Sequence, residues 1–224
     1  MTDDNYLCRA SKILLIGAGP STAELIREIS VFSDAIVAAD GGFRAAENAG
    51  AEVILVVGDM DSQQDLPTDQ AVAHIADQET TDFQKCLAVC DADVFLGVGF
   101  LGGRLDHQLA AFSAILNEPR PVVLVDEAQL VFVVPPEFSM DLEAETPVGF
   151  YPMVPIQASL RGVRWPLSNA AMSPMGQIAT SNSALGGALE ISVDGPGLLA
   201  ILPRRDFAGV LAALDRGFGR AQHQ

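Results

Sequence analysis

The first 127 residues alternate apolar runs with stretches of helical character, and this alternation is the strongest constraint on the fold. The runs are continuously apolar, as expected for strands that helices cover on both faces of a parallel sheet. They lie at residues 12–19, 34–40, 51–59, 71–76, 93–99 and 121–127. The sequence therefore predicts a doubly wound, mostly parallel α/β domain over residues 1–130.

The second part of the chain has a different sequence pattern. Short apolar runs separated by glycine, proline and asparagine occupy residues 158–172, 176–185, 187–195 and 197–204. This spacing is typical of a small antiparallel sandwich or barrel. We expect an all-β domain over residues 131–224 that ends in an amphipathic helix at residues 206–221.

Composition excludes several classes of protein. No apolar run reaches the roughly 20 residues that a membrane span needs, and the polar start "MTDDNYLCRASK" is unlike a secretory signal, so we expect a cytoplasmic protein without a membrane partner. The net charge of −16 argues against nucleic acid, whose binding needs a basic surface. Cys8, Cys86 and Cys90 are expected to be structural thiols, because further soft metal ligands do not accompany them.

Acidic residues follow the predicted strands at the edge where such sheets bind ligands. Asp40 ends one strand, Asp59 and Asp61 follow another, and Asp82 begins the next helix. A single aspartate there would be an ordinary turn former or helix cap, and Asp106 fits that reading equally well. The pair of Asp59 and Asp61 requires a counter-charge, and hard oxygen ligands favour Mg²⁺.

Glycine pairs share this edge. Glycine lets backbone N–H groups approach a phosphate without a Cβ in the way, and a helix N-terminus adds positive potential. Arg104 and Lys85 could add positive charge for a triphosphate. The glycines in question are Gly17 and Gly19, Gly41 and Gly42, and Gly102 and Gly103. Together with the carboxylates they indicate a site for phosphate and Mg²⁺.

A dinucleotide-binding enzyme is the competing interpretation. "GAGPST" opens a helix, and Asp40 lies about 20 residues further on, where an acid that binds ribose would be expected. Thr22, however, replaces the third glycine of that motif, and this interpretation gives no role to Asp59, Asp61 or Asp82. We therefore rank it second.

With these motifs assembled, the sequence resembles the thiamin pyrophosphokinase family. The matching stretches follow the family's order and span residues 39–199. They are "ADGGFRAAENAG", "VGDMDS", "DQETTDFQKCL", "GFLGGRLDH", "SLRGVRWPLSN" and "TSNSALGGALEISVDGPGLL". The combination is far more specific than any single stretch.

The resemblance implies transfer of the pyrophosphoryl group of ATP to thiamin, giving thiamin diphosphate and AMP. It implies a homodimer with Mg²⁺ as cofactor, in which an α/β domain binds ATP and thiamin lies between subunits. The catalytic residues would be Asp40, Asp59, Asp61 and Asp82, with Asp59, Asp61 and Asp82 as metal ligands. The nucleotide side would include Gln78, Lys85, Arg104, Asp106 and His107 besides the glycines, and Ser181 and Asn182 would belong to the thiamin pocket.

Three positions depart from the family's pattern. Phe100 and Leu101 stand where small or polar residues are common, and Ala200 stands where some relatives carry an aromatic residue. Trp165, the only tryptophan, is expected in the core of the β domain.

Three other functions stay open on the sequence alone. One is a pyrophosphokinase for another alcohol, such as a hydroxymethyl pterin. The second is a sensor of thiamin or nucleotide without activity, and the third is the nicotinamide-dependent oxidoreductase.

Overall fold

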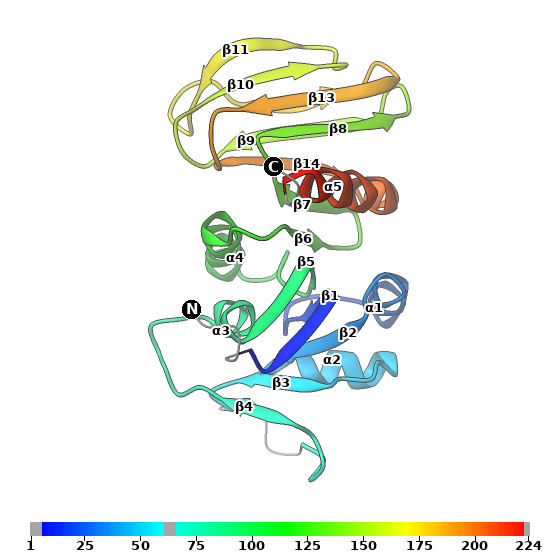
Figure 1. Ribbon diagram of the computed structural model, residues 1–224, viewed down its shortest axis with the longest axis vertical. Helices are drawn as coiled ribbons and strands as arrows, with labels where there is room; N and C mark the ends of the chain where they lie inside the picture. Colours follow the sequence, from blue (N-terminus) through cyan, green and yellow to red (C-terminus); the bar gives the residue numbers. More distant parts are fainter. Residues whose placement is uncertain (1–5, 61–65, 222–224) are drawn as a thin grey trace. The chain divides into compact units, whose positions relative to one another are not determined.

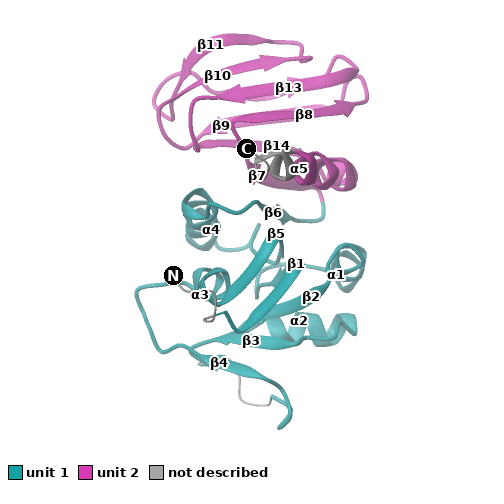
Figure 2. Cartoon of the chain, in the orientation of Figure 1, with its two compact units in different colours: residues 1–127 teal, residues 128–224 magenta. Residues whose placement is uncertain are grey.

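The computed structural model describes residues 6–60 and 66–221, with side chains up to residue 216 (Figure 1). The chain divides into two compact units, residues 1–127 and residues 128–224 (Figure 2). The elements of unit 1 are β1 Cys8–Ile16, α1 Ala23–Ser30, β2 Ala35–Ala39, α2 Gly42–Ala49, β3 Leu55–Gly58, β4 Val72–His74, α3 Asp82–Val89, β5 Cys90–Val98, α4 Leu105–Asn117 and β6 Val122–Val125.

Unit 1 is a parallel sheet covered by helices on both faces. Its strands lie in the order β6-β5-β1-β2-β3-β4, and every neighbouring pair is parallel. Helices α1 and α2 pack together over one face, while α3 and α4 cover the other (Figure 1). The chain moves outward from β1 in one direction to β4 and then returns to β5 on the other side of β1. The prediction of a doubly wound α/β domain is confirmed.

The core of unit 1 follows from the continuous apolar runs. Residues 13–16 of β1 are completely buried, as are residues 123–125 of β6. Burying one such aliphatic side chain contributes roughly 1.5–3 kcal/mol, so a strand that is apolar on both faces strongly favours this central position. The carboxyl ends of these strands consequently meet at one edge of the sheet.

Unit 2 consists of two antiparallel sheets and a C-terminal helix. One sheet has the order β12-β9-β14-β7 and the other β11-β10-β13-β8. The bounds are β7 Gln129–Val133, β8 Glu137–Leu142, β9 Pro147–Pro152, β10 Ile156–Arg161, β11 Leu167–Met172, β12 Ala179–Ser183, β13 Gly187–Val193, β14 Leu198–Pro203, a 3-10 turn at Arg204–Asp206 and α5 Phe207–Ala221. The predicted all-β domain with a C-terminal helix is confirmed.

Helix α5 packs against β8 of its own unit. Phe207, Val210, Leu211 and Leu214 are buried, and their spacing places them on one face of the helix. The approach is close, because a Cβ built on Gly209 would lie 3.0 Å from Met140 Cε.

The cysteines agree with their expected structural role. Cys8 and Cys90 lie opposite each other in the β1–β5 pair, and all three thiols are free and buried. Burial raises the pKa of Cys90 to about 12, so this thiol stays protonated and unreactive at neutral pH.

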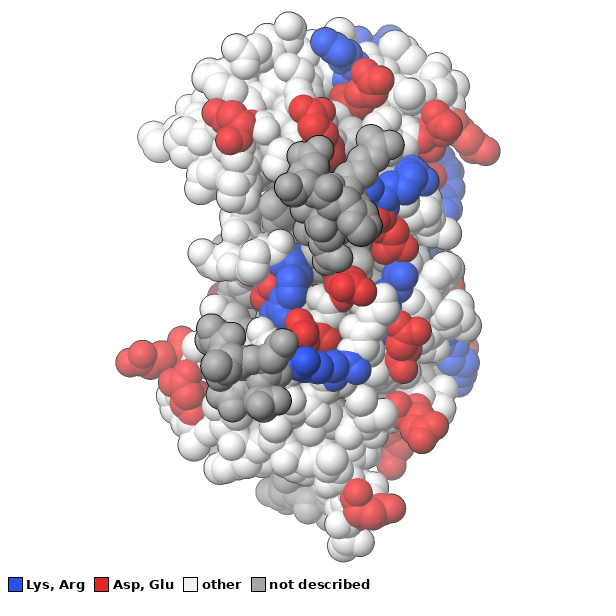
Figure 3. Space-filling view, viewed as in Figure 1, with Lys and Arg blue, Asp and Glu red and all other residues white. Residues whose placement is uncertain are grey.

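The surface carries charges of both signs. Acidic and basic side chains are interspersed on the face shown in Figure 3. Among the described helices, none combines the length and the apolar character needed to cross a bilayer.

Candidate active site

Three carboxylates converge at the carboxyl edge of the parallel sheet. Asp40 follows β2, Asp59 follows β3, and Asp82 opens α3. One oxygen from each residue lies within 4.8 Å of the others. Such a set of hard oxygen donors fits a divalent cation such as Mg²⁺. Asp61, the remaining predicted ligand, lies outside the described residues.

Asp40 is held in an unusual backbone conformation. It is 3% exposed and has φ of +34°, a region that side-chain-bearing residues rarely adopt. Its N–H donates to the carbonyl of Val57 at 2.8 Å, and its own carbonyl accepts from Phe43 N–H at 3.0 Å. A residue in such a region costs about 1–3 kcal/mol and persists only where its surroundings enforce it. Here the adjoining strand and the start of α2 enforce it.

Gly58 allows two of the carboxylates to approach. A Cβ built on Gly58 would lie 2.7 Å from Asp40 Cβ and 3.3 Å from Asp82 Oδ1. The first distance is shorter than real Cβ contacts, so a side chain at Gly58 would displace Asp40. Gly58 is part of the motif "VGDMDS", but the sequence alone does not show that glycine is required there. The requirement follows from how closely Asp40 and Asp82 approach the backbone of β3.

Hydrogen bonds orient the other two carboxylates. Gln78 Nε2 donates to Asp59 Oδ2 at 2.9 Å. Helix α3 begins with a capping box, in which Thr81 Oγ1 accepts from Gln84 N–H and the Gln84 side chain accepts from Thr81 N–H. This cap fixes Asp82 in the first turn of α3.

Lys85 is a buried cation beside the cluster. Its Nζ donates to Asp82 Oδ1 at 3.0 Å, and the residue is 4% exposed. Burial alone would lower the pKa of Lys85, but the hydrogen bond and charge of Asp82, with the charges of Asp59 and Asp77, raise it above its usual value. Lys85 therefore stays protonated and partly compensates the gathered negative charge.

The glycines after β1 hold two loops together. Gly17 N–H donates to the Val98 carbonyl at 2.8 Å, and Gly19 N–H donates to the Gly99 carbonyl at 2.9 Å. A Cβ on Gly17 or Gly19 would lie 2.6 or 2.5 Å from the Gly99 carbonyl oxygen. Both N–H groups are thus used inside the protein, at the place where a dinucleotide-binding fold presents such groups to phosphate.

The N-terminus of α1 already has an acidic partner. Glu127, which follows β6, accepts through Oε1 from Thr22 N–H at 3.1 Å and from Thr22 Oγ1 at 2.6 Å. Thr22 Oγ1 in turn accepts from Leu25 N–H and caps the helix. The carboxylate of Glu127 supplies the negative charge that a bound pyrophosphate would otherwise bring to this helix end.

The loop after β5 carries the predicted nucleotide residues. Gly102 and Gly103 have φ of +73° and +65°, and Gly102 N–H donates to Gln108 Oε1 at 2.9 Å. Arg104 donates through Nε and Nη2 to the two carboxylate oxygens of Asp106. This hydrogen bonding holds the pKa of Asp106 below its usual value. The side chains of both residues are exposed, at 70% for Arg104 and 64% for Asp106.

The other predicted nucleotide residues lie nearby in the sequence. His107 follows in the first turn of α4 and is exposed. Gly41 caps α2, and Gly42 begins that helix so close to the Ile16 carbonyl that no side chain would fit.

In unit 2, Asn182 holds Trp165 in place. Asn182 is 4% exposed, its Oδ1 accepts from the N–H groups of Trp165 and Ser183, and its Nδ2 donates to the Trp165 carbonyl at 2.9 Å. The guanidinium carbon (Cζ) of Arg164 lies 5.1 Å from the centroid of the Trp165 ring, and Trp165 is 55% exposed. Ser181 has φ of +59° and is also exposed.

The prediction that Trp165 belongs to the core is therefore wrong. Its backbone is fixed by a buried amide, while its side chain faces solvent. Hydrophobicity alone could not separate the position of the main chain from that of the ring.

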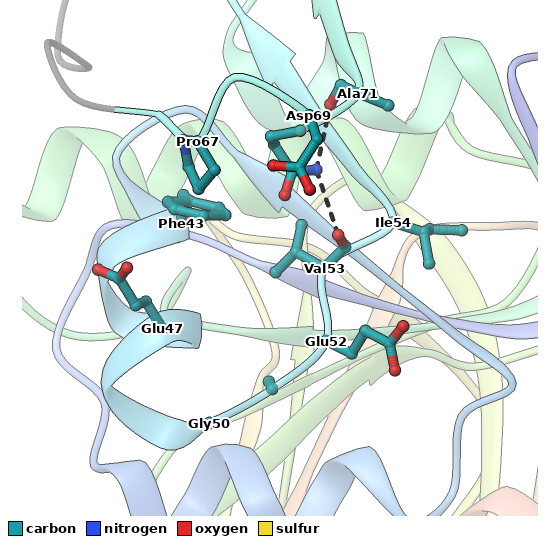
Figure 4. Close-up of a pocket in the computed structure, with 11 residues that line it drawn as sticks. Phe43, Glu47, Gly50, Glu52, Val53, Ile54, Pro67, Asp69 and Ala71 are labelled. Atoms are coloured by element: carbon teal, nitrogen blue, oxygen red, sulfur yellow. Dashed lines mark hydrogen bonds between the residues drawn. The ribbon is translucent and has the colours of Figure 1, made fainter.

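Unit 1 also has a surface hollow that is separate from the carboxylates (Figure 4). Gln70 is one of its lining residues, and Gln70 Nε2 donates to the carbonyls of Val53 and Ala71, each at 3.2 Å. The lining residues come from α2 and from the segments that precede β3 and β4, and Asp40, Asp59 and Asp82 are not among them.

Comparison with known families identifies both parts of the chain. Residues 27–124 match the model described as "Thiamin pyrophosphokinase, catalytic domain". Residues 137–198 match the model described as "Thiamin pyrophosphokinase, vitamin B1 binding domain". The chain belongs to the thiamin pyrophosphokinase family. The resemblance seen in the sequence is confirmed, and the nicotinamide interpretation is not favoured.

Named relatives support this assignment. Thiamine pyrophosphokinase 1 of Oryza sativa subsp. japonica is 32% identical over 47% of this chain and 47% of its own length. Thiamin pyrophosphokinase 1 of Caenorhabditis elegans is 27% identical over 57% of this chain and 61% of its own length. The chain spans about half the length of the curated relatives it matches.

Solved structures of the family share the fold. Thiamine pyrophosphokinase from Bacillus subtilis superposes with a TM-score of 0.70 at 21% identity, covering 86% of this chain and 98% of that one. Yeast thiamin pyrophosphokinase has a TM-score of 0.72 at 15% identity, covering 92% and 95%.

The carboxylate cluster depends on the missing side chain of Gly58. We expect Gly58→Ala to weaken Mn²⁺ binding at least tenfold, about 1.4 kcal/mol, because Asp40 and Asp82 must move apart. It should also lower the free energy of unfolding by about 1–3 kcal/mol through crowding. Titration with Mn²⁺ followed by electron paramagnetic resonance, together with urea denaturation, measures both quantities.

Gly149→Ala is the matched control. An ideal Cβ at this strand glycine would meet nothing closer than 3.5 Å, so both quantities should stay near their wild-type values. Unchanged Mn²⁺ affinity in Gly58→Ala would contradict the close approach as its function.

Proposed function

We propose that the protein transfers the pyrophosphoryl group of ATP to the hydroxyethyl group of thiamin, giving thiamin diphosphate and AMP. The observation that carries this proposal is the convergence of Asp40, Asp59 and Asp82 within a unit that matches the family's catalytic-domain model. The match of residues 137–198 to the family's vitamin B1 binding domain supports thiamin over other alcohols.

The reaction requires positioning more than covalent help from the protein. The hydroxyl oxygen of thiamin attacks the β-phosphorus of ATP, and the bond from that phosphorus to the oxygen shared with the α-phosphorus breaks. AMP leaves with the electron pair of that bond, and the hydroxyl proton passes to a carboxylate. We propose either Asp40 or Asp82 as the acceptor of this proton.

The cluster would hold Mg²⁺ through Asp40, Asp59 and Asp82, and Asp61 remains a predicted ligand. Bound there, Mg²⁺ would neutralise charge on the phosphates and orient them. Gln78 keeps Asp59 turned toward its neighbours, and Lys85 limits the repulsion among the carboxylates.

The loop after β5 would bind the phosphates. Gly103 and the start of α4 would offer backbone N–H groups, and Gly41 and Gly42 would offer the start of α2. Gly102 would shape this loop, since its own N–H already donates to Gln108 Oε1. Arg104 would exchange Asp106 for phosphate, because its exposed guanidinium fork suits either anion. His107 lies in the same turn. For Gly17 and Gly19 we propose a structural role, since their N–H groups already bind the loop after β5.

The thiamin side would involve Ser181, Asn182 and Trp165. The exposed ring of Trp165 is a suitable surface for a planar cationic ligand, because aromatic faces attract cations. Asn182 would act indirectly, through the backbone of Trp165, and Ser181 lies beside it in the sequence.

Trp165 provides a direct readout, as the chain contains one tryptophan. We expect thiamin to quench its fluorescence in the wild type. Asn182→Ala removes the bonds that fix Trp165 and should weaken thiamin binding roughly tenfold. Ser168→Ala, an exposed neighbour on β11, is the control. Quenching that is absent in the wild type would remove Trp165 from the site.

A homodimer in the cytoplasm is the assembly that we propose. Exposed apolar residues of unit 2, including Ile178 and Leu185 at 42% and 61%, are suited to contact a second copy. A fully active monomer in light scattering would contradict this assembly.

The function is tested by incubating the protein with ATP, Mg²⁺ and thiamin and identifying the products by mass spectrometry. Thiamin diphosphate and AMP in equal amounts are expected. Asp59→Asn should lower kcat roughly a hundredfold, since each tenfold needs only about 1.4 kcal/mol of lost transition-state stabilisation. Asp141→Asn, an exposed aspartate of unit 2, is the control.

Other outcomes identify the alternatives. AMP formed only with a hydroxymethyl pterin would indicate a different acceptor. Binding of thiamin without release of AMP would indicate a sensor.

A further inference from the structure

Phe100 lies in the loop after β5, within the stretch "GFLGGRLDH". Its ring packs back onto the end of the sheet and contacts α3. We propose that Phe100 is a positioning residue that fixes Asp82, and through it the metal site, by supporting the first turn of α3. This inference rests on the proposed metal-dependent function.

The end of the sheet is shaped around this ring. A Cβ built on Gly17 would lie 2.7 Å from Phe100 Cε1, and one built on Gly97 would lie 3.1 Å from Phe100 Cδ2. Glycine at these two positions thus leaves the space that the ring occupies. Gly97 belongs to β5 and Gly17 directly follows β1, so the ring lies beside the two strands that pair at the centre of the sheet of unit 1.

The partner of Phe100 in α3 is Phe83. The ring centroids of Phe83 and Phe100 are 4.2 Å apart, with an angle of 32° between their planes. Phe83 is 4% exposed and directly follows Asp82 in the first turn of α3. A shift of this turn would therefore separate the two rings.

Two other features help to position Asp82. The capping box fixes where α3 begins, and Lys85 fixes the orientation of the carboxylate. Helix α3 also packs against β1, β2, β3 and β5, but neither the capping box nor Lys85 connects its first turn to the loop after β5. The Phe83–Phe100 contact makes this connection, and we expect it to resist a shift of the first turn across the sheet. Metal sites respond to such shifts, because ligand distances must hold within about 0.2 Å.

The test measures metal binding, which requires neither ATP nor thiamin. Mn²⁺ affinity is determined by electron paramagnetic resonance for the wild type, Phe100→Ala and Phe138→Ala. Phe138 is the control, because its ring also contacts a second phenylalanine ring, that of Phe132 at a centroid distance of 5.0 Å, but within unit 2 and away from α3. We expect Phe100→Ala to weaken Mn²⁺ binding at least tenfold and Phe138→Ala to leave it unchanged.

Phe100→Met covers the case in which Phe100→Ala does not fold. Methionine fills much of the space but does not stack, and we expect its Mn²⁺ affinity to fall at least threefold. Wild-type affinity in the folded Phe100 variants would overturn the proposal, and so would an equal loss in Phe138→Ala. A wild type that binds no Mn²⁺ would overturn it as well.

The proposed function and this inference can fail separately. A wild type that forms no thiamin diphosphate, while Phe100→Ala still weakens Mn²⁺ binding, would contradict the function alone. An active wild type with unchanged Mn²⁺ affinity in Phe100→Ala would contradict the positioning role alone.

Discussion

Mutual repulsion of carboxylates is the constraint on which the active site depends. Two unit charges about 4 Å apart repel by roughly 4 kcal/mol at an effective dielectric constant of 20. Asp40, Asp59 and Asp82 nevertheless bring oxygens within 4.8 Å of one another. Such a group persists only in a rigid frame that supplies positive charge. The ends of β2 and β3 and the bare backbone of Gly58 provide the frame, and buried Lys85 provides part of the charge.

The same edge of the sheet shows why this fold need not bind a dinucleotide. In doubly wound proteins the crevice beside the first strand is the usual phosphate site. Here Gly17 and Gly19 bond to the backbone of residues 98–99, and Glu127 caps Thr22 at the start of α1. The acidic groups gather instead at the ends of β2 and β3 and at the start of α3. One fold thus supports a different chemistry through a few contacts between its loops.

Much of this arrangement could be predicted from the sequence. Continuous apolar runs indicated a parallel sheet, and the carboxyl ends of parallel strands share one edge, so Asp40, Asp59 and Asp82 were expected to converge. Spatial detail was harder to predict. The need for Gly58 depends on the spacing of β2 and β3, and the contact of Gln108 with Gly102 depends on a turn with positive φ values.

Glu127 and Trp165 show what the sequence could and could not predict about single side chains. Glu127 follows an apolar strand, so the rule that selected the aspartates could also have selected it. Trp165 was predicted to be in the core, but its ring is exposed. Asn182 binds only the backbone of Trp165 and does not bury the ring. Residue type predicts which side chains prefer the interior, but not which main-chain segments a buried amide holds at the surface.

The site described above requires a divalent cation bound among the three aspartates. Crystals grown with Mn²⁺ and a non-hydrolysable ATP analogue test it through anomalous scattering. We expect a Mn²⁺ peak in contact with oxygens of Asp40, Asp59 and Asp82 and with the phosphates of the nucleotide. Phosphates bound with Mn²⁺ elsewhere, and no peak among these carboxylates, would contradict it.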